Sequence, residues 1–65
     1  MITVGQLLDV APMQDVYILR QYKGCDEEYK YAEEIPKELN NKTVMKVYGF
    51  NAQGYDGLEV VYLWF

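Results

Sequence analysis

The C-terminal part of the sequence contains two segments that would be hydrophobic on both faces of a strand. In the segment Leu58–Phe65, one set of alternate positions is entirely apolar and the other contains a single charge, Glu59. The segment from Thr43 to about Phe50 is similar, with Lys46 as its charged residue. An antiparallel strand with one face in water alternates between apolar and polar residues. We therefore expect both strands to be covered on both faces, either by the rest of the chain or by another protein.

The N-terminal segment predicts a two-turn helix over 4–10. Thr3 and Gln6 have the spacing of a capping box, in which each residue hydrogen-bonds to the backbone of the other. Apolar residues then recur at the spacing of one helix face. Pro12 disfavours helical backbone at the residue before it, and so it ends the helix. A helix of this length is unstable alone and must pack against other elements.

The middle of the chain predicts a hairpin and a short helical turn. A strand over 15–23, rich in β-branched and aromatic residues, is followed by a turn at 24–27 and by a strictly alternating strand over 28–33. The segment 35–39 begins with a proline and predicts a single helical turn. A long hairpin loop over 51–57 connects the last two strands.

The fold class is therefore α+β, a single domain over 1–65 with the order α-β-β-α-β-β. We expect a four-stranded antiparallel sheet with the N-terminal helix on one face and the short helical turn between the two hairpins.

Such a sheet is wider than its helix. Four strands span about 19 Å, whereas a helix covers about 10–12 Å. One explanation is that the C-terminal strand is central and buried on both sides. The other is that the surplus aromatic surface contacts a second copy or another protein, because interface cores are rich in aromatic residues. The candidate interface residues are Tyr48, Phe50, Tyr62, Trp64 and Phe65.

The residue types exclude most catalytic chemistry. The chain has no His and no Ser, and Cys25 is its only cysteine. A Ser–His or Cys–His pair, a zinc site of the usual His and Cys ligands and an internal disulfide cannot be built from these residues. We therefore expect a non-enzymatic protein with no cofactor and no metal.

The charge is acidic, with ten Asp and Glu against six Lys and Arg. This balance disfavours direct binding to nucleic acid and to anionic membranes. A local cluster of acids has two explanations: an ordinary solvated hairpin edge, or a surface that docks on a basic groove, as in inhibitors that imitate nucleic acid. The cluster consists of Asp26, Glu27, Glu28, Glu33 and Glu34.

The sequence also bears on localisation. It has no apolar run near 18 residues and no basic segment followed by an apolar core at its N-terminus. Together with the lone cysteine, this predicts a complete short protein of the cytoplasm.

Several short motifs resemble those of short uncharacterised proteins of Firmicutes bacteria, their phages and other mobile elements. The motifs are Ile2-Thr3-Val4-x-x-Leu7-Leu8, Val16-Tyr17-Ile18, Ile35-Pro36-Lys37-Glu38-Leu39, Thr43-Val44-x-x-Val47 and Asp56-Gly57-Leu58-Glu59-Val60. The resemblance implies a bacterial or phage setting and supplies no catalytic or binding residues. The function we expect is a small protein-interaction module that self-associates, as a homodimer or higher, through an aromatic sheet face or edge. The alternative is an acidic phage-type inhibitor of a host nucleic-acid enzyme or defence system.

Overall fold

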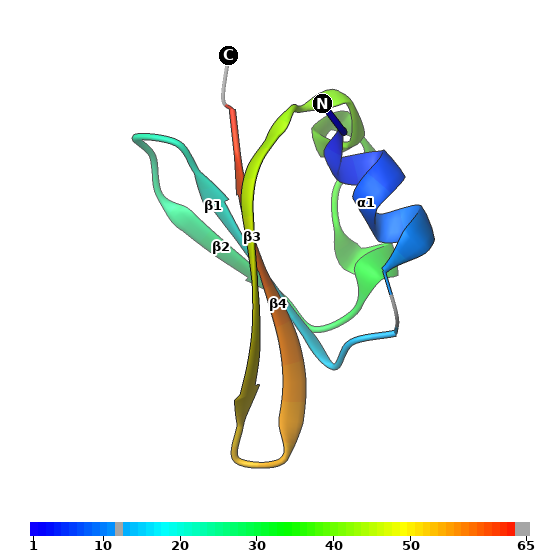
Figure 1. Cartoon of the computed structure of the whole chain (residues 1–65), viewed down its shortest axis with the longest axis vertical. Coiled ribbons are helices and arrows are strands. Elements are labelled where there is room, and N and C mark those ends of the chain that lie inside the picture. Colours follow the sequence, from blue (N-terminus) through cyan, green and yellow to red (C-terminus); the bar gives the residue numbers. More distant parts are fainter. Residues whose placement is uncertain (12, 64–65) are drawn as a thin grey trace.

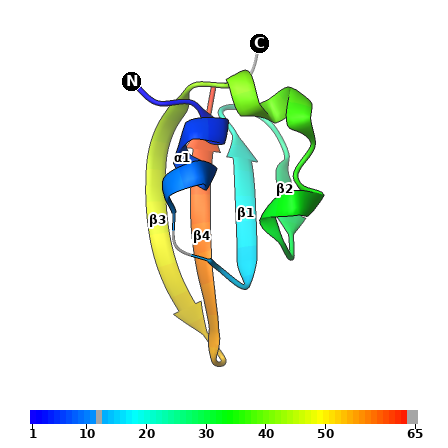
Figure 2. The same ribbon diagram turned by 90° about the vertical axis from the view of Figure 1, so that its right-hand side faces the viewer.

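A computed structural model describes residues 1–11 and 13–63. Its four strands form one sheet in the order β2-β1-β4-β3, and the helix and two 3₁₀ turns lie on one face of that sheet (Figures 1 and 2). The elements are α1 (Val4–Val10), β1 (Val16–Gln21), β2 (Asp26–Tyr29), η1 (Ala32–Glu34), η2 (Lys37–Asn41), β3 (Val44–Ala52) and β4 (Tyr55–Tyr62). The predicted α+β class, the four strands and the helix on one face are confirmed.

The capping box predicted for α1 is present. The backbone N–H of Gln6 donates to Thr3 Oγ1 at 3.2 Å, and the backbone N–H of Thr3 donates to Gln6 Oε1 at 3.0 Å. The helix ends at Ala11, whose backbone is extended. It is tied to the rest of the chain at its first residue, because Val4 is fully buried and its N–H donates to the carbonyl oxygen of Lys42 at 2.9 Å.

The two central strands, β1 and β4, run parallel, and here the expectation of a wholly antiparallel sheet is wrong. Each strand belongs to an antiparallel hairpin, β1 with β2 and β4 with β3, as predicted. Between the hairpins, the segment with η1 and η2 carries the chain back along the sheet, so that β3 starts near the end where β2 started (Figure 2). β4 therefore has the direction of β1 and pairs with it from Val16–Gly57 to Gln21–Tyr62.

The second strand is shorter than its alternating sequence predicts. Strand β2 ends at Tyr29, so only the first two residues of the predicted strand over 28–33 belong to it, and the 3₁₀ turn η1 lies at its predicted end. β2 begins at Asp26, inside the turn predicted over 24–27. The carboxylate of Glu34 accepts hydrogen bonds from the backbone N–H groups of Lys30 and Tyr31, at 3.0 and 3.3 Å. These bonds turn the chain away from the sheet, since the amides that would extend the strand are already paired.

The loop expected over 51–57 is instead a tight turn. Strands β3 and β4 continue to Ala52 and Tyr55, with Gln53 and Gly54 between them. Both of these residues have positive φ, 53° and 83°. Two-residue hairpin turns with this backbone match the right-handed twist of the strands, and glycine adopts it without steric cost.

The hydrophobic core lies between the sheet and the segment formed by α1, η1 and η2. Its fully and nearly fully buried members are Val4, Tyr17, Leu19, Ile35, Leu39, Val60 and Tyr62. Alternate residues of β1 and β4 supply the sheet side of this core. The opposite face of the sheet is therefore formed by the residues between them.

Gly57 provides a test of packing on that opposite face. Phe50 is paired directly with Gly57, and a Cβ atom at position 57 would overlap the Phe50 ring. We predict that Gly57→Ala lowers the free energy of unfolding by about 1–2 kcal/mol, because the ring must leave its position. Urea denaturation measures the effect.

Gly49 is the matched control, since a Cβ there would meet no atom within 4 Å. Gly49→Ala should leave stability unchanged or raise it by about 0.5 kcal/mol. In a Phe50→Ala background the penalty of Gly57→Ala should disappear. A penalty that persists in that background would show that the ring is not its cause.

Candidate functional site

The sheet face opposite α1 is called the open face here. None of the helical elements among residues 1–11 and 13–63 lies over it (Figure 1). The residues of the open face are identified from the buried positions of the strands and from the pairing register, because successive residues point to opposite faces. They are Val16, Ile18 and Arg20 from β1, Asp26 and Glu28 from β2, Lys46, Tyr48 and Phe50 from β3, and Glu59 and Val61 from β4.

Aromatic and apolar side chains are exposed on this face. Tyr48 is 51% exposed, Tyr22 48% and Met45 46%. These three side chains, with Arg20, Lys46, Glu59 and Val61, line a shallow hollow of about 460 Å³. Exposed apolar surface on a sheet that lacks a covering layer is typical of a contact site for another protein.

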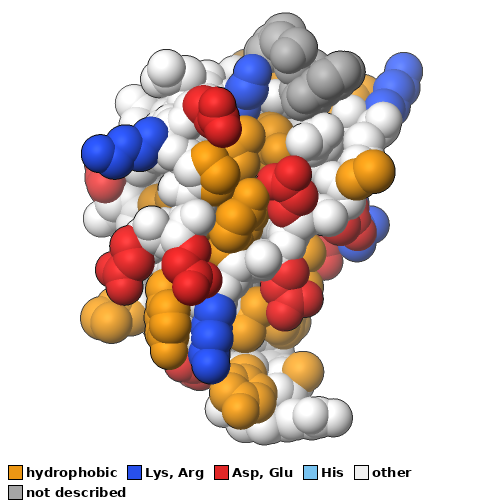
Figure 3. All heavy atoms as spheres, turned by 180° about the vertical axis from the view of Figure 1, so that it is seen from behind, with side chains coloured by type: hydrophobic (Ala, Val, Ile, Leu, Met, Phe, Trp, Pro, Cys, Tyr) orange, Lys and Arg blue, Asp and Glu red, His pale blue; other side chains and the backbone are white. Residues whose placement is uncertain are grey.

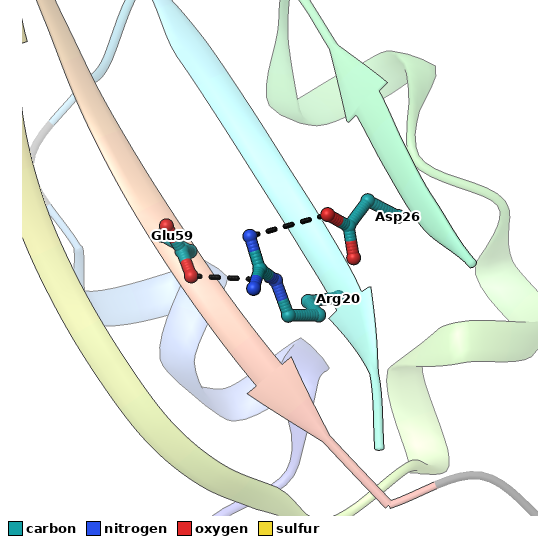
Figure 4. Close-up of polar contacts among 3 residues, drawn as sticks. All are labelled: Arg20, Asp26 and Glu59. Atoms are coloured by element: carbon teal, nitrogen blue, oxygen red, sulfur yellow. Dashed lines mark ion pairs between the residues drawn. The ribbon is translucent and has the colours of Figure 1, made fainter. Parts of the chain in front are cut away.

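The charge of the open face is balanced around Arg20. Arg20 Nη2 lies 3.1 Å from Asp26 Oδ2, and Arg20 Nε lies 3.5 Å from Glu59 Oε1 (Figure 4). The arginine and Asp26 are about half exposed, so these pairs contribute little to folding stability. The two pairs reduce the net charge in the middle of the open face, because the guanidinium group is neutralised by carboxylates on both neighbouring strands.

A β-bulge decides which residues of β3 reach the open face. Val44 pairs with Tyr62 on the covered face, the register shifts between Val44 and Lys46, and Lys46 then pairs with Val61 on the open face. From there the alternation is regular, so Tyr48 and Phe50 follow Lys46 on the open face. Two of the predicted interface residues thus lie side by side on one strand.

Tyr62 does not lie with them. It is 0% exposed and belongs to the core on the covered face, so its prediction as an interface residue is wrong. The physical reason is its position in β4, since it directly follows Val61, and successive residues of a strand point to opposite sides of the sheet. The other two predicted residues, Trp64 and Phe65, lie outside the described residues.

The five clustered acids do not form one patch. Asp26 and Glu28 belong to the open face, and Asp26 pairs with Arg20. Glu27 lies on the other side of β2 and accepts a hydrogen bond from the Tyr29 hydroxyl at 2.6 Å. Glu34 caps the backbone before η1. Glu33 is exposed in η1, so the carboxylates are distributed over several surfaces.

A second hollow, of about 310 Å³, lies on the covered side between β2 and η2. Its lining residues are Gln21, Glu27, Tyr29, Pro36, Glu38, Leu39 and Lys42. Figure 3 looks at the molecule from the β2 side, where hydrophobic side chains gather between acidic ones. Desolvation by burial is the largest cause that raises the pKa of Tyr29 from 10.0 to about 12, and the hydrogen bond to Glu27 and the nearby carboxylate charges add to it.

The hydroxyl of Tyr62 is buried and makes no hydrogen bond of standard geometry. Burial raises the pKa of Tyr62, and a hydrogen-bonding interaction with the side chain of Gln21, its neighbour on β1, lowers it in part. A buried hydroxyl without a partner costs free energy. The Tyr62 hydroxyl is therefore only weakly hydrogen-bonded, with Gln21 as its neighbouring polar group.

Groups suited to metal or redox chemistry are sparse. In the part of the chain that the structure describes, no group of three or more Cys, Asp and Glu side chains could hold a metal ion. Cys25 is exposed in the turn between β1 and β2, next to Asp26. Within residues 1–11 and 13–63, no helix is long and apolar enough to span a membrane.

Comparison of the chain with known protein families, with curated proteins and with solved structures gives no match.

The two tyrosine hydroxyls make a matched pair of tests. We predict that Tyr62→Phe leaves the free energy of unfolding unchanged or raises it by about 1 kcal/mol, because it removes a buried hydroxyl that makes no hydrogen bond of standard geometry. Tyr29→Phe removes a hydroxyl that donates to a carboxylate, and should lower it by about 1 kcal/mol. Equal losses in both variants would show that the Tyr62 hydroxyl is hydrogen-bonded in solution.

The titration of Tyr29 gives a second test. A tyrosine whose pKa is higher in the folded state than in the unfolded state stabilises the fold below pH 10, and this contribution is lost as the pH rises from 10.0 towards about 12. Tyr29→Phe should therefore show a shallower loss of stability over this range. Glu27→Gln should move the pKa of Tyr29 back towards 10, as followed by the Tyr29 ring carbon in NMR. An unchanged pKa in that variant would contradict the role of Glu27.

Proposed function

We propose that this chain is a small non-enzymatic protein-interaction module that self-associates through the surface of β3. The observation that carries the proposal is the exposure of β3, an edge strand whose residues from Met45 to Gly49 are all exposed. Lys46 is the one charged residue along its length. A long, exposed strand with so little charge is a surface that soluble proteins ordinarily protect.

The opposite edge of the sheet supports the choice of β3. Strand β2 spans only Asp26–Tyr29, and three of its four residues are acidic. Short length and charge are the usual means by which an edge strand avoids pairing with other chains. Since one edge carries these features and the other carries only Lys46, β3 is the edge that favours association.

The small core gives a thermodynamic reason for association. A 65-residue chain buries only about 60% of the surface that its unfolded form exposes, so its stability is marginal. Burial of Tyr48 and its neighbours against a second copy would add apolar burial that the monomer lacks. Association would then stabilise the folded chain.

The alternative function, an acidic inhibitor of a nucleic-acid enzyme or defence system, has weaker support. Its five carboxylates are distributed over separate surfaces, and Asp26, Glu27 and Glu34 are each engaged with neighbouring groups of the chain. The bacterial or phage setting and the cytoplasmic location remain predictions from the sequence.

Sedimentation analysis over a concentration series tests the proposal. We expect the wild-type chain to dimerise in a concentration-dependent manner, and Tyr48→Lys to weaken dimerisation at least tenfold. The added lysine would be compatible with the monomer, since Tyr48 is exposed and paired with Glu59. In a dimer it would place a further charge in the contact. A wild-type chain that stays monomeric at millimolar concentration would overturn the proposal.

Tyr31→Lys is the matched control. The exposed fraction of Tyr31 is 48%, similar to the 51% of Tyr48. Tyr31 lies at the start of η1, beyond the opposite edge of the sheet from β3. The substitution changes the net charge by the same amount, so it should leave the dimerisation constant within about twofold of wild type. Equal weakening by both variants would indicate a general charge effect and would contradict a contact at β3.

A further inference from the structure

Among the residues that the structure describes, only the start of β3 is paired along its outer edge. At its start, the N–H of Val44 donates to the carbonyl oxygen of Ile2 at 2.9 Å, and Thr3 and Thr43 form an isolated bridge. Beyond that point no strand among residues 1–11 and 13–63 pairs with the outer side of β3 (Figures 1 and 2). A strand in this position presents a row of N–H and C=O groups that another strand can pair with.

The regular part of this edge is bounded on both sides. The bulge between Val44 and Lys46 ends it at one side, and the turn at Gln53 and Gly54 ends it at the other. The segment 46–52 between these limits has Gly49 as its midpoint. It contains no proline and, after Lys46, no charge.

We propose that two copies of this chain pair antiparallel along their β3 edges, around a twofold axis at Gly49, to form one continuous sheet. This inference rests on the proposed self-association and specifies its geometry. The partner is a second copy, because a twofold pairing lets the same segment, 46–52, supply both strands over its whole length.

The register follows from strand geometry. Residues directly opposite each other in an antiparallel pair point to the same face. The twofold axis must therefore lie between the two copies of one residue of β3. With the axis at Gly49, Tyr48 lies opposite Phe50 of the second copy on the open face. By symmetry, Phe50 lies opposite Tyr48 of the second copy, so the pair contains two aromatic contacts. Aromatic cross-strand pairs stabilise antiparallel sheets. Val47 then lies opposite Asn51, and Lys46 opposite Ala52.

Other axes are less favourable. An axis at Tyr48 places Lys46 opposite Phe50, and an axis at Val47 places Lys46 opposite Tyr48 while bringing the two lysines within about 7 Å along the strands. An axis at Phe50 leaves Tyr48 opposite Ala52 and gives one aromatic pair in place of two. The axis at Gly49 separates the two lysines by roughly 20 Å along the strands.

The open space around Gly49 agrees with this register. A Cβ atom at Gly49 would meet no atom within 4 Å. Glycine within a strand often marks a place where another backbone approaches closely. In the proposed pair the two Gly49 backbones face each other across the axis, and a side chain introduced there would have space on the sheet face.

Disulfide trapping tests the register directly, because only the residue at the axis lies opposite its own copy in the second chain. In a Cys25→Ala background, which removes the exposed native thiol, we expect Gly49→Cys to form an interchain disulfide on mild oxidation. The control Val47→Cys should not, because its two copies would be roughly 13 Å apart along the strands, beyond the Cα separation of about 7 Å that a disulfide allows.

A mixed experiment tests the same register without a change at Gly49. Chains with Val47→Cys and chains with Asn51→Cys are combined, and we expect disulfides between unlike chains in preference to like chains, because Val47 lies opposite Asn51. The products are resolved by mass spectrometry, and in guanidinium chloride the preference should vanish.

The outcomes separate the two proposals. If sedimentation shows a dimer but neither Gly49→Cys nor the mixed pair cross-links selectively, the edge pairing is wrong and self-association survives. If the wild-type chain is monomeric throughout, both proposals fail. A disulfide preference centred on another residue of β3 would overturn the axis at Gly49.

Discussion

The parallel pairing of β1 with β4 is the contact on which the rest of the structure depends. It joins two hairpins, each marginal as an isolated unit, into one sheet in the order β2-β1-β4-β3. It also makes β1 and β4 the central strands, so that Leu19, Val60 and Tyr62 form the middle of the core. The same arrangement places β3 at one edge, where its exposure provides the candidate contact surface.

Local features of the sequence predicted much of this fold. The capping box at Thr3 and Gln6 defined α1, and runs rich in β-branched, aromatic and aliphatic residues located both hairpins. The parallel pairing could not be predicted in this way, because it depends on the path of the connection with η1 and η2. That path is set in part by Glu34, whose carboxylate binds backbone amides that could otherwise have extended β2.

The candidate site was predictable only in part, for a similar reason. An excess of aromatic residues in the last two strands indicated that some of them would remain uncovered, and Tyr48 on β3 is more than half exposed. Which face each residue occupies depends on the bulge near Met45 and on the side that α1 covers. Neither is encoded in strand periodicity, and Tyr62 was therefore assigned to a surface although it fills the core.

The parallel contact also has a consequence for the order of folding. Its partners, such as Val16 and Gly57, are far apart in the sequence, whereas the contacts within each hairpin are local. Pairings between distant residues form slowly, since the entropy of closing a long loop must be overcome first. β4 follows β1, β2 and β3 in the sequence, so β1 stays without its central neighbour until residues 57–62 have also been synthesised. Until then β1 has no strand on the side where β4 will pair, and its N–H and C=O groups on that side are open to pairing with other strands.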